Sequence, residues 1–146
     1  MEEIGNILRQ AGYFEGRSID ISDIIQMYDE HGYHYHNNQR AFIEEYAHLE
    51  IHYNHPVWKQ DMLLRLNPME AQKAITMDVV EEYNEFVQDD LLIIGDIEKE
   101  NMTLFLSEKG FFYTGFDDCL MNWGNNFETM IHRLASGDKG ELMIID

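Results

Sequence analysis

The sequence predicts an α+β fold, a single domain over residues 1–146 in which an antiparallel sheet is backed by helices. Helical periodicity fills the first third of the chain, strand patterns are grouped in the middle, and an amphipathic helix closes it. Two prolines, no Gly/Ser tract and no fixed-period repeat leave nothing that marks a linker between domains. A chain of 146 residues buries enough surface to hold a core without a disulfide or a metal.

Two apolar sets at helical spacing predict the first helices. Asp20 is the candidate N-cap of the first helix, and the polar pair Asn37-Asn38 precedes the second. The first set is Ile21, Ile24, Ile25 and Tyr28. The second set is Phe42, Ile43, Tyr46 and Leu49.

Alternation of apolar and polar residues then predicts the start of the sheet. Leu49, Ile51 and Tyr53 fall on one side of a strand, with Glu50 and His52 on the other. A second short strand is expected near residues 62–66. A short helical stretch at 69–75 and a longer helix at about 78–88 follow.

The last third of the chain predicts strands and then a helix. Residues 91–97 form one strand, and residues 102–106 and 111–113 form a hairpin whose loop contains Gly110, a residue that readily adopts positive φ. The closing helix begins at a cap supplied by Asn125 or Asn126 and ends at Gly137. Its apolar face is Phe127, Met130, Ile131 and Leu134.

The composition is strongly acidic. Twenty-eight Asp and Glu against 10 Lys and Arg give a net charge of −18 with neutral histidines. Ten cations leave little from which to build the positive face that binds phosphates, so we expect no direct nucleic-acid partner. The same sign disfavours an anionic membrane surface, whereas a basic protein partner fits.

Features that would signal export or redox chemistry are not evident in the sequence. Cys119 is the single cysteine, and no CxxC pair is present. The first residues show no cationic segment followed by an apolar one, and the longest aliphatic run, 91–94, is too short to span a bilayer. We therefore expect a cytoplasmic protein.

The helix at 78–89 carries the most informative pattern. Five acids lie within an arc of about 100° around its axis, and apolar residues occupy the opposite arc. The acids at i,i+3 and i,i+4 on this face repel one another. No Lys or Arg occurs between Lys73 and Lys99, so no cation on the helix offsets this repulsion. A solvated outer face and a surface for a cationic partner are both compatible with this pattern. The acids are Asp78, Glu81, Glu82, Glu85 and Asp89, and the opposite arc holds Val79, Val80, Tyr83, Phe86 and Val87.

Six histidines within 25 residues raise the alternative of a small metal-dependent hydrolase. No HExxH accompanies them, and the pair His34 and His36 shares one side only if that segment is a strand. We therefore expect no metal, no cofactor and no catalytic residue, so that the protein is not an enzyme. The histidines are His31, His34, His36, His48, His52 and His55.

Other catalytic and ligand-binding patterns are weak. The chain lacks GxSxG, GxxxxGK[ST] and GxGxxG. Asp96, Glu98 and Glu100 alternate as in a calcium loop, but Asn101 and Ser107 stand where an EF-hand has glycine and glutamate. Asp117 and Asp118 lie beside Cys119, with no histidine nearby in sequence.

Several local patterns occur together in one order. They are Leu8-Arg-Gln-Ala-Gly12-Tyr13-Phe-Glu-Gly16-Arg17, Phe42-Ile-Glu-Glu-Tyr-Ala-His-Leu49, Ser107-Glu-Lys-Gly110-Phe-Phe-Tyr113, Phe116-Asp117-Asp118 and Trp123-Gly124-Asn-Asn-Phe127-Glu128. Over about residues 5–137 the chain resembles the third clade of the SUKH superfamily, bacterial immunity proteins. It departs in two places: Tyr13 and Glu15 replace a tryptophan and a proline, and Ala47-His48 replaces a glycine-rich step.

The resemblance implies an α+β domain with an antiparallel sheet, and a role in binding and neutralising a cognate toxin that attacks nucleic acids. A toxin of this kind needs a basic cleft, which an acidic inhibitor complements. We expect occlusion by the helix face, joined by acids after it; the alternatives are the hydrolase and a SUKH-fold scaffold for an endogenous partner. The predicted partner-binding residues are Asp78, Glu81, Glu82, Glu85, Asp89, Asp90, Asp96, Glu98, Asp117 and Asp118.

Overall fold

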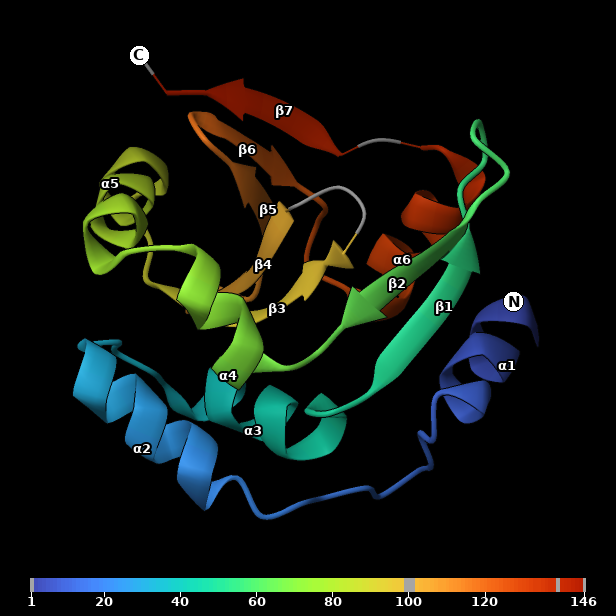
Figure 1. Cartoon of the computed structure of the whole chain (residues 1–146), viewed down its shortest axis with the longest axis horizontal. Coiled ribbons are helices and arrows are strands. Elements are labelled where there is room, and N and C mark those ends of the chain that lie inside the picture. The colour runs from blue at the N-terminus through green and yellow to red at the C-terminus, as the bar shows by residue number, and fades with distance from the viewer. Residues whose placement is uncertain (1, 99–101, 139, 146) are drawn as a thin grey trace.

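The computed structural model describes residues 2–98, 102–138 and 140–145, which form a seven-stranded sheet with helices on both sides (Figure 1). The helices are α1 (Glu2–Gln10), α2 (Ser22–His31), α3 (Asn37–Tyr46), α4 (Pro68–Ala71), the 3-10 turn η1 (Gln72–Ala74), α5 (Met77–Val87) and α6 (Phe127–Ser136). The strands are β1 (Glu50–Asn54), β2 (Asp61–Arg65), β3 (Leu91–Ile97), β4 (Met102–Ser107), β5 (Phe112–Phe116), β6 (Cys119–Asn122) and β7 (Glu141–Ile144).

The sheet is a meander. Its strands follow the chain in the order β1-β2-β3-β4-β5-β6-β7, and each pairs antiparallel with the next. The α+β class and the antiparallel sheet predicted from the sequence are confirmed. A register shift between Ile93 and Gly95 bends β3, and Tyr28 of α2 donates its hydroxyl to the Ile93 carbonyl at 2.6 Å. A β-bulge of this kind changes the direction of a strand. Here the hydrogen bond from Tyr28 joins α2 to β3 at the bulge.

Helices cover both faces of the sheet, with α5 on one side and α6 on the other (Figure 1). On the α5 side, the ring of Tyr83 meets Phe105 of β4 edge to face. On the other side, Phe42 of α3 packs against Phe112 of β5 and Phe127 of α6, with ring centroids 5.4 and 5.0 Å apart. Because side chains alternate along β4 and β5, each strand contributes residues to the packing on both faces of the sheet.

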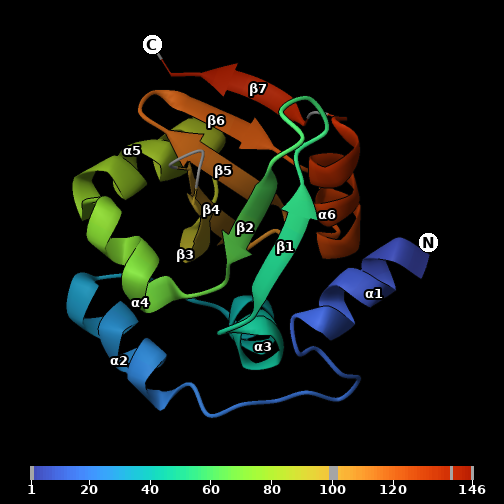
Figure 2. The ribbon, with the colours of Figure 1, turned by 45° about the vertical axis from the view of Figure 1, so that its right-hand side comes forward.

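The sheet curls so that its first hairpin approaches β6 and α6 (Figure 2). Pro56 and Val57, at the tip of the β1–β2 hairpin, line a cavity of about 180 Å³ together with Trp123 after β6 and Leu134 of α6. The indole of Trp123 donates to Thr114 Oγ1 at 2.9 Å, which ties this region to β5. The β1–β2 hairpin, at one end of the strand order, therefore lies close to the residues that follow β6 at the other end.

Most of the predicted elements are present in the structure. The alternation over 50–53 is confirmed by the burial of Ile51 and Tyr53, and Asn126 caps α6 by accepting from the Thr129 N–H. The cap proposed for α2 differs, because Asp20 lies one residue before the N-cap position. Its Oδ1 nevertheless accepts the Ser22 N–H at 2.9 Å.

The prediction that the chain closes on an amphipathic helix is wrong, because β7 follows α6. Gly137 ends α6 with φ of 88°, as predicted, and the chain then returns along β6. A Cβ on Gly140 would lie 2.1 Å from the Asn122 carbonyl oxygen, so only glycine allows this approach. The sequence patterns predict neither the strand β6 nor the helix α1.

The two segments where the chain departs from the SUKH pattern meet at the end of α3. Arg17 donates to the carbonyl oxygens of Glu45 and Ala47 at 2.5 and 2.8 Å, so a cation satisfies the last carbonyls of the helix. Tyr13 donates its hydroxyl to the Glu45 carboxylate. His48 has φ of 71°, so the residue that replaces a glycine keeps a backbone conformation that glycine favours.

None of the helices in the described ranges combines the length and the apolar character that crossing a membrane requires.

Candidate functional site: an acidic face bordered by aromatic rings

Helix α5 forms because its sequence separates an apolar stripe from an acidic one. Val80 and Tyr83 are buried against the sheet, and Asp78 lies in the first turn, where the helix dipole favours an anion. Gln88 ends the helix in the left-handed conformation with φ of 58°. The side-chain oxygen of Asn84 then accepts the Leu91 N–H at 2.9 Å, which fixes the step from α5 into β3.

The outward side of α5 is acidic and exposed. Asp78, Glu81, Glu82 and Glu85 are all exposed, and among the described residues no cation lies within ion-pairing distance of any of them. Each like-charge neighbour on such a face costs about 0.2 to 0.5 kcal/mol of helix stability. The face is therefore single-signed and uncompensated within the described chain.

Tyr83 joins α5 to the turn between β5 and β6. Its hydroxyl donates to the Asp117 carbonyl oxygen at 2.6 Å, and a Cβ on Gly115 would lie 2.8 Å from its ring. Burial raises the pKa of Tyr83 to about 12, with Asp117 and Glu82 adding to the shift. The phenol thus stays protonated and able to donate this bond at neutral pH.

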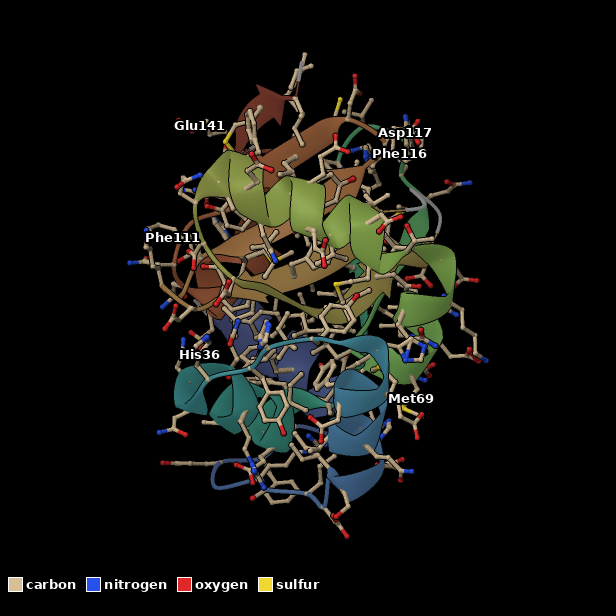
Figure 3. All side chains as sticks on the ribbon, turned by 90° about the vertical axis from the view of Figure 1, so that its left-hand side faces the viewer. His36, Met69, Phe111, Phe116, Asp117 and Glu141 are labelled. Carbon is tan, nitrogen blue, oxygen red and sulfur yellow. The ribbon has the colours of Figure 1, made fainter. Side chains whose placement is uncertain are left out.

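A groove of about 650 Å³ runs between α5 and this turn. The carboxylates of Glu82, Asp117 and Asp118 line it, together with Thr76 and Phe116. The tertiary fold therefore brings the predicted acids of the β5–β6 turn to the predicted acidic helix. Figure 3 shows Phe116 and Asp117 beside one end of α5.

Two exposed aromatic rings border the acidic groups. Phe86 is 41% exposed and Phe116 is 47% exposed. The prediction that Phe86 lies on the buried arc of α5 is wrong. Four residues advance an α-helix by about 40° beyond one turn, so Phe86 lies next to Glu82, at the border of the acidic stripe.

The remaining predicted acids have local partners or lie apart. The Asp96 carboxylate accepts two hydrogen bonds from the Arg65 guanidinium, at 2.9 and 2.8 Å, and is therefore charge-paired. Asp89 accepts backbone N–H groups from Asp90 and Lys109. Glu98 is exposed at the end of β3.

The histidines do not gather into one cluster. His52 pairs with Asp61 across the β1–β2 hairpin at 3.0 Å, and His55 stacks on Trp58. The segment of His34 and His36 is not a strand, so the two imidazoles are not presented on one side of one. Among the described residues, a group of three metal-ligating side chains occurs at His36, where it comes close to two carboxylates.

Cys119 is a poor nucleophile in its surroundings. Burial raises the pKa of its thiol, and a hydrogen bond to the Asp118 carboxylate raises it further. A higher pKa leaves less thiolate, the reactive form, at neutral pH. This arrangement does not favour thiol chemistry beside the acidic turn.

Comparison with known proteins places the chain in a family. The family model described as SUKH-3 immunity protein matches residues 1–137. No curated protein and no solved structure matches the chain. The family match spans every helix and all strands but β7 among the described residues. The chain therefore belongs to the SUKH-3 immunity protein family.

Proposed function

We propose that this immunity protein neutralises its cognate toxin by covering a basic, nucleic-acid-binding surface of the toxin with the acidic face of α5 and the β5–β6 turn. The protein supplies no catalytic residue in this proposal and acts inside the producing cell. The observation that carries it is the uncompensated row of Asp78, Glu81, Glu82 and Glu85. A cationic partner would relieve the repulsion within this row.

The shape of the site favours the same kind of partner. Arginine side chains bind carboxylates through paired hydrogen bonds and also stack on aromatic rings. The groove offers Glu82 and Asp117 beside the exposed ring of Phe116, and the exposed ring of Phe86 lies one helical turn beyond Glu82 on α5. A toxin that binds phosphates presents arginines and lysines for that purpose, so the same side chains fit this face.

The proposed contact makes a prediction about rates as well as affinity. A single-signed surface attracts an oppositely charged partner over a distance of about one Debye length, and salt screens that attraction. Association with the toxin should therefore slow as ionic strength rises. Dissociation should depend more on the groove and its aromatic border, where contacts are short-ranged.

The experiment begins with affinity purification of the partner from the producing cells and expression of its toxic domain. The affinity of the purified pair is then measured by calorimetry, together with degradation of nucleic acid by the toxin. The variant Glu81→Lys, Glu82→Lys, Glu85→Lys should bind more than tenfold more weakly, a loss of about 1.4 kcal/mol or more, and should fail to inhibit. The matched control Glu15→Lys, Glu50→Lys, Glu128→Lys changes the net charge equally at exposed sites outside α5 and the β5–β6 turn.

The outcomes separate the alternatives. Loss of affinity in the α5 variant with retention in the control supports the proposal. Affinity within a factor of about two in the α5 variant, roughly 0.4 kcal/mol, would show that the toxin binds elsewhere. A housekeeping protein as the stoichiometric partner, with no protection from a toxin, would support the scaffold role instead.

A further inference from the structure

Three metal-ligating side chains from distant parts of the chain meet beside the β4–β5 hairpin. His36 precedes α3, Asp90 lies between α5 and β3, and Glu108 lies in the hairpin loop. His36 Nε2 is 3.2 Å from Asp90 Oδ2, and His36 Nδ1 is 3.3 Å from Glu108 Oε2. One ligand atom from each residue lies within 4.8 Å of the other two. Figure 3 shows His36 on the same side of the molecule as Phe111, the residue that follows the hairpin loop.

Hydrogen bonds that do not involve the side chains of the cluster hold the backbone of the three segments in place. The Glu108 N–H donates to the Asp90 carbonyl at 2.9 Å, and the Asn38 amide donates to the Glu108 carbonyl at 2.8 Å. The fully buried amide of Gln39 donates to the carbonyl oxygens of Asp90 and Leu106. The positions from which the three side chains project are therefore set in advance.

We propose that His36, Asp90 and Glu108 bind a divalent ion of the zinc class. An imidazole nitrogen with two carboxylates is a donor set that Zn²⁺ accepts, whereas Ca²⁺ and Mg²⁺ prefer oxygen alone. With a neutral imidazole, the cluster carries two negative charges that a divalent ion would balance. Lys109, the cation next to it in sequence, directs its ammonium to the Gln88 carbonyl at 3.1 Å.

The separations suit such an ion. Two ligands at zinc distances in a tetrahedral shell lie about 3.3 Å apart. The His36 Nε2 to Asp90 Oδ2 distance is 3.2 Å, so these atoms already stand at ligand separation. The Glu108 carboxylate lies at the other imidazole nitrogen, Nδ1, and its 48% exposed side chain would have to rotate toward Nε2 to join the same ion. Water then completes the shell, because the cluster is open to solvent.

Within the described ranges, no other histidine is grouped with two further metal-ligating side chains. His52 has the single carboxylate of Asp61 at 3.0 Å, and His34, two residues before His36, is exposed. Both are therefore matched controls for imidazoles that lie outside the three-ligand cluster. The inference concerns the free protein and does not depend on the proposed toxin.

The test is calorimetric titration of untagged protein with Zn²⁺, after dialysis against a chelator, with thermal unfolding measured in parallel. One equivalent should bind, and the unfolding temperature should rise because the ion binds the folded state. His36→Ala and Glu108→Gln should each weaken binding at least tenfold. His34→Ala and His52→Ala should bind as the wild type does, and Ca²⁺ at the same concentration should bind in none of the proteins.

Substitution by Co²⁺ gives a readout of ligand identity. The visible absorption of bound Co²⁺ reports a nitrogen and oxygen shell of low coordination number, and His36→Ala should abolish it. Circular dichroism of His36→Ala confirms that the variant is folded. Zinc binding that is unchanged in His36→Ala, or no binding by the wild-type protein, would overturn the inference and leave His36 as the ion-pair partner of two carboxylates.

Discussion

The hydroxyl of Tyr83 in α5 donates a 2.6 Å hydrogen bond to the main-chain carbonyl of Asp117 in the β5–β6 turn. This bond joins the two parts of the acidic surface, which are 34 residues apart in sequence. Asp117 has φ of 52°, a conformation that non-glycine residues adopt at some cost. The hydrogen bond therefore positions the β5–β6 turn relative to α5 and keeps the carboxylates of the turn and of the helix around one groove.

Removing this hydroxyl should weaken both the fold and the proposed interface. Tyr83→Phe leaves the ring in place but deprives the Asp117 carbonyl of its donor, so the free energy of unfolding should fall by about 0.5 to 1.5 kcal/mol. Urea denaturation measures the loss. The control is Tyr35→Phe, because Tyr35 donates to Asp29 at 3.3 Å on the exposed surface and should contribute little. Equal stability of the Tyr83 variant and wild type would show that the bond is not stabilising.

Adding one methyl group at Gly115 should displace α5. The new Cβ would lie 2.8 Å from Cε2 of the buried Tyr83 ring, so the ring and its helix must move. Overpacking of this kind costs about 1 to 3 kcal/mol. Chemical denaturation of Gly115→Ala should show that loss. Gly5→Ala is the control, because its Cβ meets only the flexible Arg9 side chain within α1, where alanine favours the helix. A Gly115 variant as stable as wild type would contradict this account of the contact.

The sequence predicts the central strands and the acidic stripe of α5, because both follow from local periodicity. It misplaces Phe86, since the apolar arc of α5 is wider than the part that Val80 and Tyr83 bury. Among the described strands, β7 pairs with β6 alone and leaves Leu142 and Ile144 exposed, so its residues lack an alternating burial pattern. Hydrogen-bonded pairing with β6, rather than the composition of its own residues, makes β7 a strand.

Tertiary proximity is the part of the candidate site that the sequence does not reveal. Asp117 reaches α5 through Tyr83, and His36 reaches Asp90 across 54 residues. No local pattern encodes either approach. The charge pairing of Asp96 with Arg65 is likewise a property of the β2–β3 register, which the spacing of acids along the chain does not contain.

Replacing His48 by glycine should stabilise the protein. His48 is exposed and has φ of 71°, while its N–H donates to the Leu66 carbonyl at 2.6 Å, a bond that glycine retains. Relief of the left-handed conformation outweighs the added freedom of the unfolded chain, so the free energy of unfolding should rise by about 0.5 to 1 kcal/mol. His34→Gly is the control, because His34 is exposed without positive φ and should lose stability. A decrease in stability for the His48 variant would contradict the prediction.

The stability of the protein should fall steeply in alkaline solution. Burial raises the pKa of Tyr28, Tyr33, Tyr46 and Tyr113, and it raises the pKa of Tyr83 to about 12. An unfolded tyrosine ionises near pH 10, so the folded state binds more protons above that pH. The stability that these tyrosines contribute is therefore fully present below about pH 10 and is lost as the pH rises. The contribution of Tyr83 is lost over the range up to about pH 12.

Each tyrosine that ionises only on unfolding contributes a slope of about 1.4 kcal/mol per pH unit to the free energy of unfolding. Urea denaturation at several pH values between about 9 and 11 measures the total slope, and tyrosinate absorbance follows ionisation of the folded protein. Tyr83→Phe removes one titrating group, so its slope should be smaller than that of wild type. Tyrosinate absorbance that rises near pH 10 without unfolding would contradict the prediction, because it would show that these phenols reach water in the folded protein.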